Sequence, residues 1–233
     1  MRTSGSLAGA PSRTPVILSW SGGKDSALSL RALRQDAGVE VIGLLTSVTR
    51  DYDRVSVHGV RRSLLREQAR RIGLAVFEIA LDSACTNQAY EDAFLAALPE
   101  IRRQREDVSA IAFGDLFLAD VRKYRERLLT GSGFDPLFPI WGLDTAALAR
   151  RFITDGFEAR LVCVDTTQLD ASFAGRLFDA ALLSDLPPEV DPCGERGEFH
   201  TFVSDGPGFS GPVAYRVGAR VLRDGRFMFC DLE

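Results

Sequence analysis

A phosphate-binding pattern lies near the start of the chain. It consists of six consecutive residues: Ser21, Gly22, Gly23, Lys24, Asp25 and Ser26. The small residues leave backbone N–H groups free to face an anion, and a helix that begins here would add the positive end of its dipole. Lys24 supplies a mobile positive charge and Ser26 a hydroxyl donor. The spacing therefore predicts a loop that binds the phosphates of a ligand.

The spacing also indicates which kind of phosphate loop this is. A Walker A loop has four residues between its first glycine and Gly-Lys-Ser/Thr, whereas here Gly-Gly-Lys-Asp-Ser follows the apolar run 16–18 almost directly. The dinucleotide fingerprint Gly-x-Gly-x-x-Gly is also absent. The loop at 21–26 resembles that of the N-type ATP pyrophosphatases (PP-loop enzymes), where it holds the pyrophosphate part of ATP. This resemblance implies cleavage between the α and β phosphates and an adenylated substrate.

A second polar cluster lies near the C-terminus. Two carboxylates, two glycines, a histidine and a threonine fall within residues 194–201. Glycines allow a backbone to approach a ligand closely. Glu195 and Glu198 could hold Mg²⁺, accept protons from an amine or pair with arginines. Taken alone, the cluster is also typical of a polar surface turn that precedes a strand.

Together, the two clusters resemble the diphthine–ammonia ligase family and its bacterial relatives. The resemblance runs from about residue 16 to about 209 and includes Gly114-Asp115, Pro139-Ile140-Trp141 and the motif Gly-Glu-x-Gly-Glu-Phe-His-Thr. The branch that makes diphthamide has Glu-Gly-Gly-Glu-aromatic-Glu-Thr at this motif. This chain has Arg196 inside the motif and His200 in place of a glutamate. It resembles the bacterial branch, so diphthine is not implied as its substrate.

The resemblance implies a reaction and a set of site residues. ATP would adenylate a substrate carboxylate, pyrophosphate would leave, and ammonia or an amine would displace AMP to form an amide. The expected nucleotide-binding residues are Ser21, Gly22, Gly23, Lys24, Asp25, Ser26, Gly114 and Asp115; the expected catalytic residues are Lys24, Glu195, Glu198 and His200; the expected Mg²⁺ ligands are Asp25 and Glu195. Either Glu198 or His200 is expected to deprotonate the amine. Asp25 could equally be a charge at a helix N-terminus.

These residues need a sheet that brings them to one edge. Apolar runs that alternate with helical patterns predict an α/β fold with a parallel, doubly wound sheet, and the resemblance implies the adenine nucleotide α-hydrolase-like (HUP) version of it. The expected strands are 16–18, 39–46, 74–80, 109–113 and 159–164, followed by a hairpin of 213–221 and 227–230 around Asp224-Gly225. Helical periodicity is expected through 27–37, 65–72, 90–101, 148–152 and 173–181, with a break at 136–141.

Three segments are expected from this pattern. Residues 1–14 are expected to be a loose tail, because they are rich in Ser, Gly, Ala, Arg and Pro. Residues 15–137 are expected to form the ATP-binding domain. Residues 138–233 are expected to form a smaller α+β domain that binds the second substrate.

The composition excludes several classes of protein. The chain has 233 residues, a formal net charge of −4 and 45% hydrophobic residues, which is ordinary for a globular protein. A nucleic-acid partner would favour a basic excess, so none is expected. None of the four cysteines forms Cys-x-x-Cys, so no zinc ribbon or iron–sulfur site is indicated. Because no secretory signal or membrane-length apolar run is present, a cytoplasmic location without a membrane partner is expected.

Two other functions use a similar loop or fold. An enzyme that modifies tRNA by thiolation or lysine transfer would share the loop, but the acidic balance and the missing Cys-x-x-Cys count against it. A nucleotide-binding sensor without turnover would share the fold, but the cluster at 195–201 counts against it. The ligase interpretation implies a small-molecule or protein-borne carboxylate and ammonia or an amine as partners, and leaves a homodimer open.

Five side chains are given an expected place. His58 lies in a polar loop and is expected to be solvated, and Lys24 is expected to be exposed. Trp141 is expected to be a packing anchor. Arg122 and Arg125 could each bind a phosphate or a substrate carboxylate, or lie free on the surface.

Overall fold

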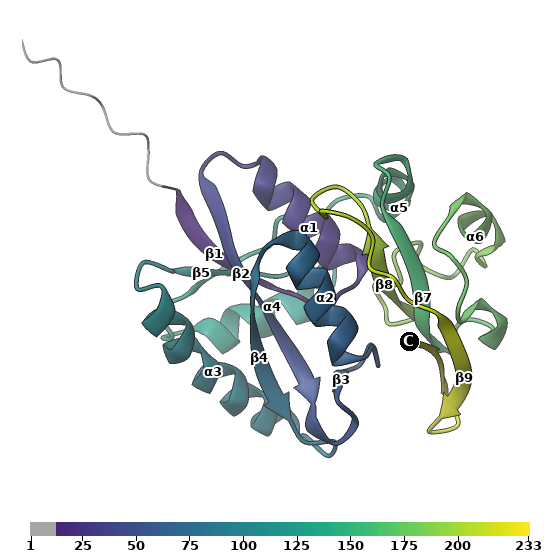
Figure 1. Ribbon diagram of the computed structural model, residues 1–233, viewed down its shortest axis with the longest axis horizontal. Coiled ribbons are helices and arrows are strands. Elements are labelled where there is room, and N and C mark those ends of the chain that lie inside the picture. The colour runs from purple at the N-terminus through teal and green to yellow at the C-terminus, as the bar shows by residue number, and fades with distance from the viewer. Residues whose placement is uncertain (1–12) are drawn as a thin grey trace, which may run out of the picture.

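Two β-sheets organise the chain (Figure 1). The structure is a computed structural model, and it describes residues 13–233. The tail expected at 1–14 lies outside the described residues except for its last two positions, and Thr14 already belongs to a strand. In the described part of the chain, no helix is long and apolar enough to cross a membrane.

The first sheet has six strands in the order β3-β2-β1-β5-β6, and β4 also pairs with β2. The strands are β1 (Thr14–Ser19), β2 (Val39–Thr49), β3 (Arg54–Val55), β4 (Ala75–Leu81), β5 (Ala110–Ala112) and β6 (Asp135–Leu137). The helices are α1 (Lys24–Gln35), α2 (Arg62–Ile72), α3 (Asn87–Gln104) and α4 (Ala119–Leu129), with a 3₁₀ helix at Arg50–Tyr52. The strands pair in parallel, except that the short β3 is antiparallel to β2.

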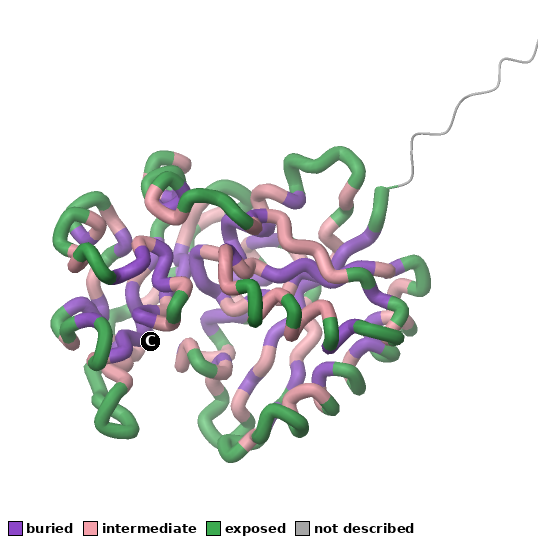
Figure 2. Tube along the Cα trace, turned by 180° about the vertical axis from the view of Figure 1, so that it is seen from behind, coloured by how far each residue is buried: buried purple, intermediate pink, exposed green. Residues whose placement is uncertain are grey.

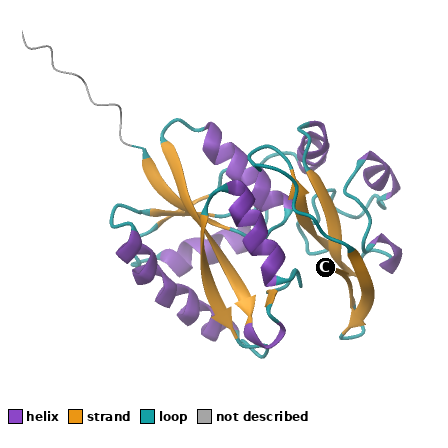
Figure 3. Ribbon diagram, viewed as in Figure 1, coloured by secondary structure: helices purple, strands orange, loops and turns teal. Residues whose placement is uncertain are grey.

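Alternate side chains of β1 enter two different hydrophobic cores, because successive residues of a strand point to opposite faces. Val16 and Leu18 pack with the buried side of α1 and α2, whereas Ile17 packs with α3 and α4. Helices therefore cover both faces of the sheet (Figure 3), and buried residues follow its central strands (Figure 2). The predicted α/β fold with a doubly wound, largely parallel sheet is confirmed.

The strand order creates a topological switch point beside β1. The chain continues from β1 to β2 on one side and later places β5 on the other. In open α/β sheets, ligands bind outside the carboxyl ends of the strands at such a point. The segment after β1 carries residues 21–26, and the segment after β5 carries Gly114 and Asp115. The fold therefore brings two of the predicted motifs to one edge of the sheet.

The second sheet is antiparallel and has the order β8-β7-β10-β9. Its elements and neighbours are α5 (Thr145–Thr154), β7 (Glu158–Asp165), a 3₁₀ helix (Ala171–Phe173), α6 (Ala180–Asp185), β8 (Phe199–Asp205), β9 (Val217–Arg223) and β10 (Phe227–Leu232). The predicted hairpin is present, and its turn residues Asp224 and Gly225 have φ of 52° and 61°, as a type I′ turn requires. Side chains of β7 and β8 share a core with α1 and α2, so these helices join the two sheets.

The break in helical periodicity predicted at 136–141 is confirmed, since α4 ends at Leu129 and α5 begins at Thr145, but the strand at the start of this segment was not predicted. Asp135–Leu137 form the strand β6, which pairs in parallel with β5. Proline cannot donate to a ladder, so it is confined to positions such as an edge strand. β6 is an edge strand, and Pro136 is therefore compatible with it.

The helix predicted through 173–181 is wrong as a continuous element. The 3₁₀ helix ends at Phe173, and Gly175 adopts a φ of 85°, which a helix does not allow. A new helix, α6, begins after Asp179, whose side chain accepts from Leu182 N at 2.8 Å. The apolar spacing of Phe173, Leu177 and Ala181 does not reflect a buried helix face, because only Phe173 packs in the core and the other two are exposed.

Candidate active site

The loop between β1 and α1 is held by hydrogen bonds from its own side chains and from α2. Ser26 Oγ accepts from Ser21 N at 3.1 Å, and Gly22 has a φ of 82°, a conformation that favours glycine. Gln68 Nε2 donates to Gly22 O at 2.9 Å, and Gln68 Oε1 accepts from Trp20 Nε1 at 3.1 Å. Because α1 begins at Lys24, the loop ends in a helix N-terminus, where anions bind.

The same loop is bound to β8. Gln68 Nε2 also donates to Val203 O at 2.6 Å, and Lys24 N donates to Thr201 Oγ1 at 3.0 Å. Sequence reasoning missed the role of Gln68. A signal existed, because Gln68 is a polar residue in the apolar stripe of α2 beside Leu64 and Leu65, and it is fully buried.

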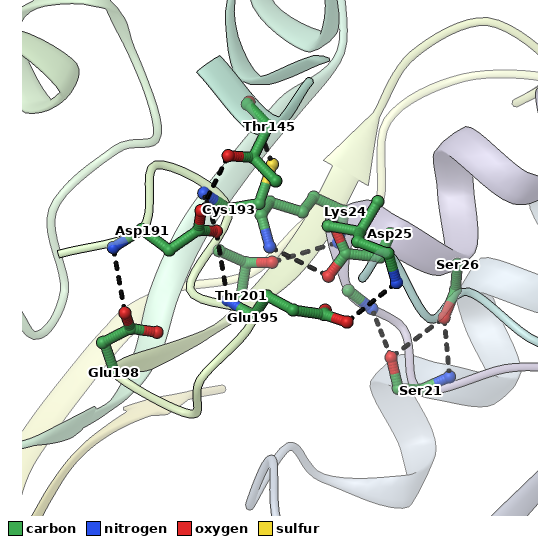
Figure 4. Close-up of polar contacts among 12 residues, drawn as sticks. Ser21, Lys24, Asp25, Ser26, Thr145, Asp191, Cys193, Glu195, Glu198 and Thr201 are labelled. Atoms are coloured by element: carbon green, nitrogen blue, oxygen red, sulfur yellow. Dashed lines mark hydrogen bonds and ion pairs between the residues drawn. The ribbon is translucent and has the colours of Figure 1, made fainter. Parts of the chain in front are cut away.

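The expectation that Lys24 is exposed is wrong. Its side chain is only 3% exposed, and Nζ lies 2.9 Å from Asp25 Oδ2 (Figure 4). Burial lowers the pKa of Lys24, but the acidic groups around it, Asp25 foremost, together outweigh that effect and the pKa of Lys24 is raised. Lys24 is therefore a fixed cation at the base of the loop.

Three carboxyl groups come together near Lys24. Asp25 Oδ1 and Asp115 Oδ2 are buried without a hydrogen-bond partner, and Glu195 Oε1 accepts from Leu116 N at 2.8 Å. Burial raises the pKa of Asp25 and of Asp115, and it raises the pKa of Glu195 to about 7. Each carboxylate of this acidic group also makes ionisation of another one less favourable.

A divalent cation fits this acidic group. Unpartnered carboxylate oxygens are hard ligands, and Mg²⁺ is usually held by one or two carboxylates together with substrate phosphates. Within residues 13–233 no three His, Cys, Asp or Glu side chains have the arrangement of a complete metal site. The residues present therefore fit a cation that a bound phosphate chain would share.

The loop before β8 is organised by its own acidic side chains. Asp191 Oδ1 accepts from Cys193 N at 2.9 Å, and Glu198 accepts from Asp191 N and from Arg196 N, both at 2.9 Å. Glu198 is 2% exposed and does not line the cavity described below. In Figure 4 it lies beyond Asp191, away from Lys24. Glu198, one of the two expected bases, therefore holds this loop in shape, and its side chain does not reach the cavity.

A cavity of about 270 Å³ lies between the phosphate loop and the loop before β8, and we call it the phosphate cavity. The predicted residues that line it are Ser21, Gly23, Lys24, Asp25, Ser26, Gly114, Asp115, Glu195 and His200. A larger cavity of about 750 Å³ adjoins it at the carboxyl ends of β1, β2 and β4, and shares Ser21, His58 and Arg125 with it. The two motifs, far apart in the sequence, thus face one hollow.

The expectation that His58 is solvated is wrong. Its ring centroid lies 4.5 Å from that of His200, and both rings line the phosphate cavity. Burial lowers the pKa of His58 to about 4, and burial together with the His58 ring lowers the pKa of His200 well below its usual value. Both imidazoles are therefore neutral at physiological pH.

The two arginines of α4 behave differently. Arg125 lines both cavities and lies 3.6 Å from Asp115 Oδ2. Arg122 instead pairs with Glu126 and lies over the ring of Trp141, with its Cζ 4.9 Å from the ring centroid. Arg125 can therefore reach a ligand, whereas Arg122 and Trp141 pack against each other.

The fold and the site together have the form of an α/β protein that binds a phosphate-bearing ligand at the end of its central strand. Residues 14–136 match the diphthamide synthase N-terminal domain, and residues 144–219 match the diphthamide synthase C-terminal domain. The chain belongs to this diphthine–ammonia ligase-like family. A search of curated proteins finds none that matches the chain.

Proposed function

We propose that this chain uses ATP to adenylate a substrate carboxylate and then forms an amide with ammonia or an amine, releasing AMP and pyrophosphate. One observation carries the proposal: the phosphate loop and the loop before β8 face each other across one cavity, beside the bond from Lys24 N to Thr201 Oγ1 of β8. Acyl transfer needs the activated carboxyl group and the nucleophile within about 3–3.5 Å of each other. Two polar loops around one cavity can provide this.

In the first step the chain would hold the phosphates of ATP in the phosphate cavity. The N–H groups of this loop other than those of Ser21, Gly23 and Lys24, which already donate within the protein, would bind the β and γ phosphates at the N-terminus of α1. The Lys24 side chain would face the charge that develops on pyrophosphate. Such preorganised contacts typically contribute about 10²–10³ each in rate. The nucleoside would occupy the larger cavity, whose walls include Leu45, Ile79 and Phe94.

Mg²⁺ would sit among Asp25, Asp115 and Glu195, where it would neutralise charge on the leaving pyrophosphate. The buried oxygen Asp25 Oδ1, which has no hydrogen-bond partner, supports this placement, and Asp115 Oδ2 has only the ion-pair contact with Arg125 at 3.6 Å. Arg125, which lines both cavities, is positioned to bind the α phosphate or the substrate carboxylate.

In the second step the nitrogen nucleophile attacks the acyl-adenylate. Of the two expected bases, His200 lines the phosphate cavity and Glu198 does not. We infer that Glu198 instead positions Glu195, since it fixes the turn that carries Glu195. Two residues of the second motif, Arg196 and His200, differ from the diphthamide-forming branch. Arg196 lies over the ring of Phe117, whereas His200 lines the cavity. His200 is therefore the difference that would bear on which acceptor is used.

Carboxylate-dependent exchange of labelled pyrophosphate into ATP tests the first step. A panel of small carboxylates and carboxylate-bearing proteins would be screened, and nucleotide products separated by chromatography. We expect exchange with at least one acid, and AMP as the nucleotide product. ADP with stoichiometric phosphate would contradict the mechanism, and tight ATP binding without exchange or AMP would favour the non-catalytic sensor.

A further inference from the structure

The segment between β3 and α2 brings a histidine to the junction of the two cavities. His58 lines both of them. A Cβ atom at Gly23 would lie 3.2 Å from His58 Cε1, so the ring lies directly against the phosphate loop. The ring also packs beside that of His200, which belongs to the second motif, with the two ring planes tilted by 40°. His58 is thus the point where the phosphate loop, the loop before β8 and the larger cavity meet.

The residue before this histidine is strained. Val57 has a φ of 68°, a conformation that is a clear outlier for a β-branched side chain. Its side chain is 70% exposed, so packing does not compensate for the strain. Such conformations cost about 1–3 kcal/mol each, persist only where the surrounding structure enforces them, and cluster at functional sites. This backbone conformation, which a glycine would adopt without strain, accompanies the position of the neighbouring His58 against the cavity.

Contacts at both ends hold the segment between β3 and α2 in this conformation. Val55 N donates to Val60 O at 2.8 Å, which closes the segment on itself. Arg54 and Arg61, at its two ends, both bind the Asp231 carboxylate of β10, at 2.7 and 2.6 Å. The last strand of the second sheet therefore fixes a segment that belongs to the first.

The surroundings of His58 define which of its nitrogens is free. Nδ1 lies 3.4 Å from Thr201 O, and a nitrogen that faces a carbonyl oxygen carries the proton. In the neutral ring, Nε2 then has a lone pair and can accept a hydrogen bond. Burial keeps the ring neutral, and the cation of Lys24 acts in the same direction by lowering the pKa of His58. The same positive charge disfavours an ammonium ion beside the ring.

We propose that His58 is a catalytic residue of amide formation, which binds the uncharged nitrogen nucleophile through Nε2 and takes its proton. The inference rests on the proposed function. The nucleophile forms a C–N bond to the acyl carbon, the bond from that carbon to the AMP oxygen breaks, and AMP leaves with the electron pair. The proton released from nitrogen moves to Nε2 and then to solvent. His200, whose tilted ring packs beside that of His58, positions it.

The test separates the two half-reactions. With His58→Ala we expect carboxylate-dependent pyrophosphate exchange within twofold of wild type, whereas amide formation falls by about 10²–10⁴-fold. AMP release should then report hydrolysis of the adenylate. His58→Gln, which keeps a polar side chain, should fold if the alanine variant does not, and should show the same loss in kcat. Val57→Gly, which removes the strain and keeps the histidine, is the matched control and should retain amide formation.

Three outcomes would overturn the inference. Wild-type amide formation by a folded His58→Ala protein would remove the histidine from the chemistry. An equal loss of exchange and of amide formation would give it a structural role only. Absence of exchange in the wild-type protein with every carboxylate would refute the proposed function, and this inference with it.

Discussion

Gln68→Met should loosen the phosphate loop from the rest of the protein. Methionine has a similar length but no hydrogen-bonding amide, and Gln68 is fully buried. Trp20 Nε1 would lose its acceptor and Val203 O would lose a donor, whereas Gly22 O keeps the bond from Val203 N. Loss of the partner of a buried polar group costs about 1–3 kcal/mol, so two such losses should lower the free energy of unfolding by at least about 2 kcal/mol.

Urea unfolding, followed by tryptophan fluorescence and circular dichroism, measures this loss. Gln88→Met is the matched control, because Gln88 is exposed and its amide bonds only to Asp92, at 2.9 Å. Its free energy of unfolding should stay within about 0.5 kcal/mol of wild type. A Gln68→Met protein as stable as the Gln88→Met protein would refute the reasoning that these bonds hold the loop. A parallel ATP titration should show weaker binding only for Gln68→Met.

Three further changes test the site. Lys24→Ala should abolish pyrophosphate exchange, and a folded variant with normal exchange would exclude the pyrophosphate contact. Gly22→Ala should lower the free energy of unfolding more than Gly73→Ala. Both glycines have positive φ, but only at Gly22 would an added Cβ meet another group, Gln68 Oε1 at 2.8 Å. Equal losses of stability on urea unfolding would argue against this contact. The pKa of Glu195 rises from 4.5 to about 7 on folding, so the folded state binds the extra proton and loses stability as pH rises through that interval. Glu195→Gln should flatten this loss in urea titrations at pH 5 and pH 8, and an unchanged slope would contradict the assignment.

Local patterns were sufficient for most of the fold. Apolar runs and helical periodicity predict β1, β2, β4 and β5 with the helices between them, because each strand buries both faces and each helix only one. The hairpin at Asp224-Gly225 follows from turn chemistry alone. β6 was not predictable in this way, because Pro136 lies on an edge strand. The helix expected at 173–181 does not form, because Gly175 has a φ of 85° and the apolar residues Leu177 and Ala181 are exposed and face no core.

Residues of the candidate site were predictable from the sequence only where several of them lie together in one short segment. The residues of the phosphate loop except Gly22 line one cavity together with Glu195. His58 and Glu198 show the limit. The segment that carries His58 is held at the cavity by ion pairs with Asp231, far along the chain. The Glu198 carboxylate accepts hydrogen bonds from the N–H groups of Asp191 and Arg196 and therefore does not line the cavity. Such long-range contacts leave no periodicity in a sequence.

Two contacts join early residues of the chain to residues that the ribosome synthesises much later. The acceptor of Lys24 N is Thr201, and the carboxylate bound by Arg54 is Asp231, each 177 residues further along. At about 5–20 residues per second, a ribosome needs roughly 10–35 s to cover that distance. During this interval the growing chain already carries its phosphate loop, but α1 and α2 lack the β7–β8 side chains that complete their core. A chaperone that binds apolar helix surfaces therefore has its target on the nascent chain in this interval, before the second sheet closes over it.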